Sequence, residues 1–185
     1  AIGYTLDELN NEITKVTPAS FEPTMDYVVT KVPRFTFEKF SNSPAILGTS
    51  MKSVGEAMAI GRNFKESLQK ALVSLEIGFS GLDRIFDLNK KEIEKKLKIN
   101  IPNKILLIAE AIRKKIKLTK IYKLSKVDLW FLEQIKEIVD AENQISKKGL
   151  PKNFNEFNRI KSIGFSDKKL SQLSGLKEKI VRRKR

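Results

Sequence analysis

The stretch MKSVGEAMAIGR, residues 51–62, combines two glycines and charged side chains of both signs with small and apolar residues. Glycine-rich loops bind phosphate when successive backbone N–H groups line the start of a helix, typically as G-x-x-x-x-G-K-[ST] or G-x-G-x-x-G. Neither pattern occurs here, because Gly61 is followed by Arg62. A buried strand with a few polar residues at its rim is the favoured interpretation.

Carboxylates offer a second kind of chemistry. Asp26, Glu38 and Glu56 would bind Mg²⁺ if the fold brought them together, but their spacing does not indicate that it does. The chain contains no His and no Cys. Histidine general bases, Ser-His-Asp triads, imidazole or thiolate metal sites and disulfides are therefore excluded within it.

The C-terminal stretch FNRIKSIGFSDKKLSQLSGLKEKIVRRKR, residues 157–185, suggests a helix-turn-helix. Gly164 and Gly175 separate short helical patterns, and the chain ends in RRKR. The alternative is a small helical subdomain with a solvated basic end, which is favoured because short helix pairs are common and DNA readers are few.

Net charge is uneven. The formal net charge is +14. Residues 1–80 carry 8 Lys+Arg and 9 Asp+Glu, whereas residues 81–185 carry 28 Lys+Arg and 13 Asp+Glu. Such asymmetry raises nucleic acid as a partner. Lysine outnumbers arginine 28 to 8, however, and directional phosphate contacts favour arginine. Compositional drift is therefore favoured over a nucleic-acid-binding helical protein, which remains the alternative function.

Trp130, Phe131 and Ile135 lie at helical spacing in the stretch DLWFLEQI. A cofactor-binding box is conceivable. Aromatic stripes of this kind normally bury against another helix, so a core or a subunit interface is expected instead.

The first part of the chain is predicted to contain one helix and two strands. Thr5 followed by Glu8 forms a capping box, which predicts a helix over residues 5–13. Residues rich in β-branched and aromatic side chains predict strands over residues 26–35 and 53–60. These elements make a small α/β piece.

The rest of the chain is predicted to be helical, in short segments that begin at capping residues and mostly end at glycines. The longest is opened by Ser125, with Asp128 in its first turn. The expected fold is mainly α, a helical bundle-like domain preceded by the α/β piece. The helical patterns cover residues 63–78, 89–98, 103–116, 125–149, 153–164, 166–175 and 176–185.

No run of about 18 apolar residues occurs, so no membrane span is expected. The N-terminus lacks the features of a secretory signal and does not begin with Met, which suggests an excised or processed chain. A cytoplasmic location is expected.

Five passages together carry a family resemblance: residues 17–40, 51–62, 66–78, 128–139 and 161–175. In order, they resemble the middle of the large chain of carbamoyl phosphate synthetase. The resemblance implies two parts. Residues 1–75 look like the C-terminal tail of the first, carboxyphosphate-forming ATP-grasp half, and residues 76–185 like the helical oligomerisation domain.

What the family does follows from the resemblance alone. The parent enzyme makes carbamoyl phosphate from bicarbonate, ammonia taken from glutamine, and ATP, for arginine and pyrimidine synthesis. It uses ATP with Mg or Mn, and K, and works with a glutaminase small subunit. The family's ATP and metal ligands, with an NPRxSRSS-type stretch, lie upstream of this chain. No catalytic, cofactor or metal ligand is therefore carried over, and the chain alone is expected to be inactive.

The role implied for this piece is architectural: it joins the two synthetase halves and associates with its own copies. Lys52, Glu56 and Arg62 are candidates for lining the route between the two sites or for a domain interface. Candidates for self-association are Trp130, Phe131 and Ile135, on the helix over residues 126–148, with the helix over residues 104–115 as a second element.

Overall fold

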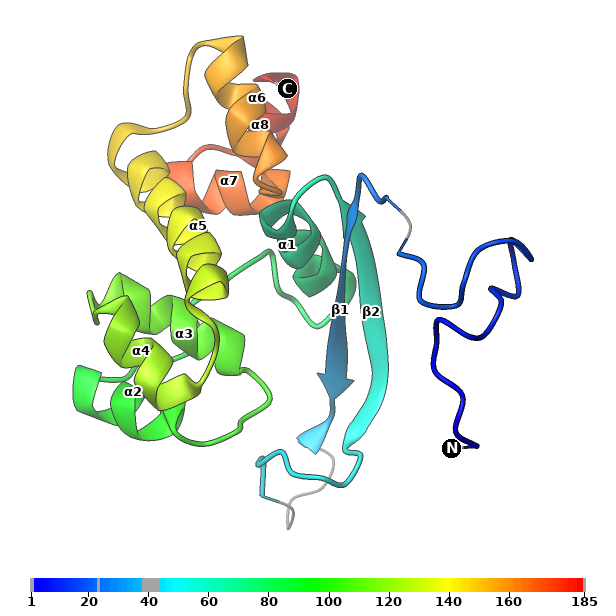
Figure 1. Ribbon diagram of the computed structural model, residues 1–185. Helices are drawn as coiled ribbons and strands as arrows, with labels where there is room; N and C mark the ends of the chain where they lie inside the picture. Colours follow the sequence, from blue (N-terminus) through cyan, green and yellow to red (C-terminus); the bar gives the residue numbers. More distant parts are fainter. Residues whose placement is uncertain (1, 23, 38–43, 185) are drawn as a thin grey trace.

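The computed structural model describes residues 2–22, 24–37 and 44–184. It shows a two-stranded sheet covered by one helix, beside a larger group of helices (Figure 1). The predicted class, mainly α with a small α/β piece, is confirmed. The elements are β1 (Val28–Phe35), β2 (Ser53–Gly61), α1 (Phe64–Ser74), α2 (Lys90–Leu97), α3 (Lys104–Arg113), α4 (Leu118–Ser125), α5 (Leu129–Lys148), α6 (Phe154–Ser162), α7 (Asp167–Ser174) and α8 (Glu178–Lys184).

The sheet is antiparallel, with Val28 opposite Gly61 and Val32 opposite Ala57. Side chains alternate between its two faces. Ala57 and Ala59 point into the interior, where Leu68 and Leu72 of α1 are also buried. One face of the sheet is therefore covered by α1, and the opposite face is open.

The helical part is organised around α5, which runs between the pair α3–α4 and the C-terminal helices α6–α8 (Figure 1). Its inward residues Leu132, Ile135 and Ile138 recur at every third position and are almost fully buried. They belong to one core that also takes in side chains of α1, α2, α3 and α7. The sheet and the helices thus share a continuous core.

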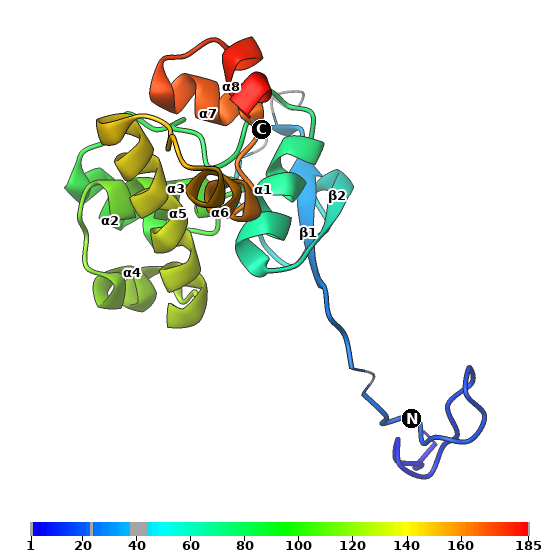
Figure 2. The ribbon, with the colours of Figure 1, turned by 90° about the horizontal axis from the view of Figure 1, so that it is seen from above.

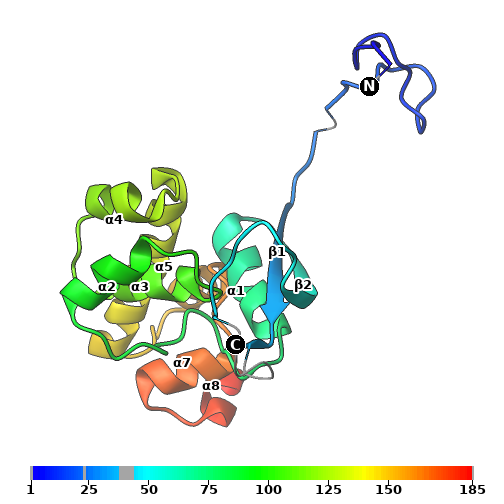
Figure 3. The same cartoon turned by 90° about the horizontal axis from the view of Figure 1, so that it is seen from below.

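The predicted helix over residues 5–13 is wrong. Thr5 and Glu8 do form the expected local bond, with Thr5 N–H donating to Glu8 Oε2 at 2.8 Å, but only a turn results. Leu6, Leu9 and Ile13 are exposed, and a short helix gains little stability without burying its apolar face. Figures 2 and 3 show this N-terminal segment extending away from the rest of the molecule.

The predicted start of the longest helix is also wrong. Ser125 is the last residue of α4, a helix that the sequence patterns did not reveal, and Asp128 is the N-cap of α5, accepting a bond from Trp130 N–H at 2.8 Å. Lys126 ends α4 in a left-handed conformation, with φ 60°.

Across the described residues, no helix combines the length and apolar character needed to cross a membrane.

Candidate interaction surfaces

The structure does not bring Lys52, Glu56 and Arg62 together. Lys52 precedes β2 and donates to the Ile46 carbonyl at 2.7 Å. Glu56 lies within β2 and pairs with Lys31 of β1 at 2.9 Å. Arg62 follows β2, and its backbone N–H donates to Glu66 Oε2 at 2.9 Å. They are spread along β2 rather than gathered in one site.

Glu66 is a buried carboxylate that the sequence analysis did not single out. Burial by itself would raise its pKa, but a 2.8 Å pairing with Lys70 and the bond from Arg62 N–H outweigh burial and hold the pKa below its usual range. Glu66 is thus a charged residue in the first turn of α1. Its signal in the sequence is its place three residues after Asn63, where it completes the start of a helix.

The three carboxylates considered for Mg²⁺ do not form a site in the described residues. Glu38 lies outside the described residues, Asp26 precedes β1, and Glu56 forms an ion pair with Lys31. No group of three or more Asp, Glu, His or Cys side chains is placed to hold a metal ion within residues 2–22, 24–37 and 44–184.

Large apolar side chains are exposed on the open face of the sheet and along the N-terminal segment. We call this set the apolar N-terminal surface. Apolar side chains that are exposed side by side mark a surface that contacts another part of a protein, and on the open face Val29 and Ile60 are cross-strand neighbours. Its members are Ile2, Tyr4, Leu6, Leu9, Ile13, Val16, Phe21, Met25, Tyr27, Val29, Val54, Met58 and Ile60.

A second exposed group is the aromatic cluster of Phe64, Trp130 and Phe131. The Phe64 ring lies 5.6 Å from Trp130 and 5.2 Å from Phe131, and the latter two meet edge-on at 5.0 Å. Trp130 is 51% and Phe131 41% exposed, whereas Ile135 is only 1% exposed. Ile135 therefore belongs to the core, and the aromatic cluster includes Phe64 of α1 in its place.

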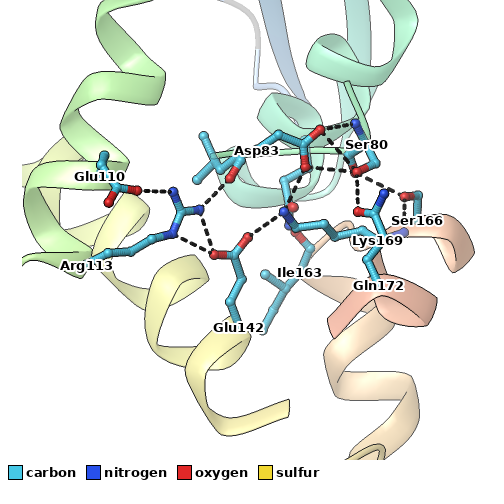
Figure 4. Close-up of polar contacts among 11 residues, drawn as sticks. Ser80, Asp83, Glu110, Arg113, Glu142, Ile163, Ser166, Lys169 and Gln172 are labelled. Atoms are coloured by element: carbon cyan, nitrogen blue, oxygen red, sulfur yellow. Dashed lines mark hydrogen bonds and ion pairs between the residues drawn. The ribbon is translucent and has the colours of Figure 1, made fainter. Parts of the chain in front are cut away.

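The interior contains a buried ionic cluster of charged side chains (Figure 4). Arg113 of α3, whose side chain is 4% exposed, donates to Glu142 Oε2 of α5 at 2.7 and 3.1 Å, to Glu110 at 3.4 Å and to the Leu82 carbonyl. Lys169 of α7 lies 3.2 Å from Glu142 Oε1, as an ion pair without the geometry of a hydrogen bond.

Lys169 also donates to Asp83 at 2.8 Å, which joins the loop before α2 to the buried ionic cluster. Burial favours a raised pKa for Asp83, but the bonds from Lys169 and from Ser80 N–H, the latter 2.6 Å long, lower the pKa below its usual range. The cluster thus ties α3, α5, α7 and the loop together. Its charges face one another across these elements, so the contacts hold the elements together.

The sequence carries a signal for this cluster in the position of Glu142. Glu142 lies between Ile138 and Ile145 on the buried stripe of α5, four residues after the first and three before the second. A charged residue at such a position is buried with its stripe and needs a partner. The pattern indicates a buried ion pair, although it does not name the partner.

Comparison with known proteins adds the family. Residues 56–185 match the family described as carbamoyl-phosphate synthetase large chain, oligomerisation domain. The chain is 50% identical over 181 residues to the carbamoyl phosphate synthase large chain of Brucella melitensis, and 50% identical over 180 residues to that of Campylobacter jejuni. It is 48% identical over 190 residues to the arginine-specific, chloroplastic large chain of Arabidopsis thaliana.

These alignments cover 94%, 97% and 100% of this chain, respectively, but only 16% of each relative. The chain therefore spans about a sixth of the length of these relatives. The similarity runs through β2 and all of the helices, including those that hold the aromatic cluster and the buried ionic cluster. The chain belongs to the carbamoyl-phosphate synthetase large-chain family and contains the oligomerisation domain of that family.

Proposed function

We propose that the chain is the connecting part of a glutamine-dependent carbamoyl phosphate synthetase. In this proposal residues 1–75 end the first ATP-grasp half and residues 76–185 form the oligomerisation domain. The parent enzyme makes carbamoyl phosphate from bicarbonate, ammonia and ATP with Mg or Mn and K, partnered by a glutaminase small subunit in the cytoplasm. The Arabidopsis relative is named chloroplastic. The family match and the large-chain relatives support this assignment.

The observation that carries the joining role is the apolar N-terminal surface. It lies on the sheet and the N-terminal segment, while α1 on the other face of the sheet contacts the helices. An apolar surface on one side and a shared core on the other are what a connector between two folded parts requires. Lys52 and Arg62 flank β2 and Glu56 lies within it, and we propose all three as contacts of that domain interface.

The joining role is tested in the full-length parent enzyme with Ile60→Asp, on the open face of the sheet. We expect faster hydrogen exchange in β1 and β2 and a loss of carbamoyl phosphate synthesis, because a charge would enter a buried interface. The control is Ile180→Asp, an exposed apolar position on α8. Equal behaviour of the two variants would contradict the role.

We further propose that the chain associates with a second copy through the aromatic cluster. Aromatic residues are favoured interface anchors, and an isologous contact needs one patch that meets its own copy. Trp130 and Phe131 each expose a large part of their rings while resting on Phe64, which holds them in place. Ile135 takes no part, since it is buried within the protomer.

Sedimentation of the chain at about 100 µM, well above the dissociation constant of a typical specific interface, tests this association. Trp130→Ala should weaken it by about 2 kcal/mol or more, the usual effect of truncating an anchor. Phe154→Ala, which removes another exposed aromatic on α6, is the control. A chain that stays monomeric at 0.15 M and 0.5 M salt would refute the proposal.

The chain by itself is proposed to be inactive. It contains no His or Cys, and the described residues hold no acidic cluster for a metal. Bicarbonate-dependent ATP hydrolysis by a homogeneous sample would contradict this. A role in nucleic-acid binding finds no support in the three relatives above, which are named as synthase large chains.

A further inference from the structure

We propose that α1 is a rigid joint, which fixes the orientation of the helical part relative to the sheet. One side of α1 lies on the sheet. Its other side is held by α5 and by the turn between α6 and α7, through Asn63, Phe64, Lys65, Gln69 and the close approach of Gly164. We call these contacts the α1 joint. The inference concerns this chain alone and stands independently of the proposed function.

The first contacts are hydrogen bonds from α1 to the end of α6. Asn63 Nδ2–H donates to the Ser162 carbonyl at 3.3 Å, and Gln69 Nε2–H donates to the Ile163 carbonyl at 3.0 Å. Carbonyls at a helix end have no partner within the helix. Here side chains more than ninety residues earlier in the chain supply the donors, so the end of α6 is completed by α1.

The second contact is between backbones. Gly164 has φ +101°, and a Cβ at this position would lie 2.8 Å from the Cα and 3.0 Å from the carbonyl oxygen of Glu66. Only glycine combines that backbone conformation with that approach. The turn between α6 and α7 is therefore in direct contact with the backbone of α1, with no flexible side chain between them.

The third set of contacts joins α1 to α5. The Phe64 ring packs against Trp130 and Phe131, and Lys65 pairs with Glu137. The first two turns of α1 are thus held by two separate elements while the same helix covers the sheet. Close-packed contacts of this kind do not deform gradually. The connection over residues 75–89 consequently does not act as a hinge between the two parts.

The absence of cysteine makes a direct test simple, because two introduced cysteines can be labelled without side reactions. Spin labels at Val29→Cys on the open sheet face and at Ser146→Cys on α5 report the distance between the two parts; both positions are exposed. Pulsed electron paramagnetic resonance should show one narrow distance distribution. A broad distribution in this otherwise unsubstituted chain would overturn the proposal.

Gly164→Ala should broaden or shift that distribution, because the new methyl group displaces the turn from α1. Gly78→Ala is the matched control. Gly78 has a similar φ of +94°, so the backbone strain is shared, but nothing lies within 4 Å of its added Cβ. If the two alanine variants give the same distribution, the close approach at Gly164 does not set the orientation and the proposal is wrong.

A milder pair decides the matter if Gly164→Ala does not fold. Asn63→Asp keeps the oxygen that caps α1, which accepts from Glu66 N–H at 2.9 Å, but loses the donor to Ser162. Asn89→Asp makes the same exchange at the N-cap of α2, where Glu92 also follows three residues later. We expect a broader distribution for Asn63→Asp and an unchanged one for Asn89→Asp. Unchanged distributions for both would overturn the proposal.

Discussion

Glu142 and Lys169 show how single residues set the geometry of this domain. Each is a charged group in the interior, where an unpaired charge is strongly unfavourable. Each is retained because it faces partners from other elements: Glu142 faces Arg113 and Lys169, and Lys169 faces Glu142 and Asp83. In the observed arrangement of α3, α5 and α7, each of these buried charges is opposed by a charge from another element.

Removing Lys169 should be costly. In Lys169→Met the apolar stem remains but Glu142 and Asp83 lose a cation, and breaking a buried pair typically costs about 3–5 kcal/mol. We expect the free energy of unfolding, measured with urea, to fall by about 3 kcal/mol. Lys168→Met, at the exposed neighbouring position, is the control. Equal losses in both variants would show that Lys169 contributes nothing through its charge.

The pairing of Lys169 with Asp83 also predicts that the stability of the fold depends on pH. The folded pKa of Asp83 is lowered by Lys169 and Ser80 against the effect of burial, so its contribution to stability is present above its unfolded pKa. That contribution is lost as the pH falls below about 4, the ordinary pKa of aspartate, towards the folded value. Urea unfolding over this range should show a shallower decline for Lys169→Met than for the unsubstituted chain. A parallel decline would contradict the assignment.

At the scale of elements, helix prediction succeeded where a capping residue and a buried stripe coincided. Asn89 and Glu92 form the reciprocal capping box of α2, and Ile93 and Leu97 are buried behind it. Thr5 and Glu8 make the same polar contact without a helix, because Leu6 and Leu9 have nothing to pack against. A capping residue positions the start of a helix, whereas packing decides whether the helix exists.

The missed helix α4 illustrates the opposite case. It begins after Lys117, which makes no capping bond, and ends at Lys126, which replaces the usual glycine in a left-handed conformation. Packing of Ile121 into the core stabilises it instead. Neither end carries a recognisable signal, and for this reason the sequence pattern places the start of the next helix at Ser125, three residues before its N-cap Asp128.

The poor start of α4 leads to a stabilising prediction. Lysine at an N-cap supplies no acceptor for the first N–H groups and places a positive charge at the positive end of the helix dipole. Lys117→Asp should raise the free energy of unfolding by about 1 kcal/mol. Lys117→Ala, which removes the charge without supplying an acceptor, should gain less. The capping explanation fails if alanine stabilises as much as aspartate in urea unfolding.

At the scale of the whole molecule, the sequence patterns predicted the fold class and the resemblance predicted the family, but neither predicted how the parts fit together. The placement of α1 between sheet and helices depends on contacts such as Gln69 with Ile163, far apart in sequence. The aromatic cluster likewise needed Phe64, which the pattern around Trp130 did not reveal. In both cases the contact depends on how the surfaces of two separate elements pack together. Periodicity within one segment does not indicate which other segment it packs against.

Charge is the property of the whole molecule with the most direct consequence. Residues 90–126 contain 13 Lys+Arg and 3 Asp+Glu, and the fold gathers them as α2, α3 and α4 at one end (Figure 1). Among their exposed lysines, Lys120 has a carboxylate partner, Glu94, at 2.5 Å. Lysines so close together repel one another, and this repulsion lowers the stability of the folded chain at low ionic strength.

Added salt should therefore stabilise the chain. The Debye length falls from about 30 Å at 0.01 M to about 8 Å at 0.15 M. Repulsion between surface charges is therefore screened progressively over this range of salt concentration. We expect the melting temperature at a low, fixed protein concentration to rise over this range and then level off, equally for chloride and for sulfate at matched ionic strength. Equality matters because screening depends only on ionic strength, whereas a phosphate-binding surface would prefer the divalent anion. A much larger rise with sulfate, together with retention on heparin at about 0.1 M salt, would replace screening by specific anion binding and revive a nucleic-acid partner.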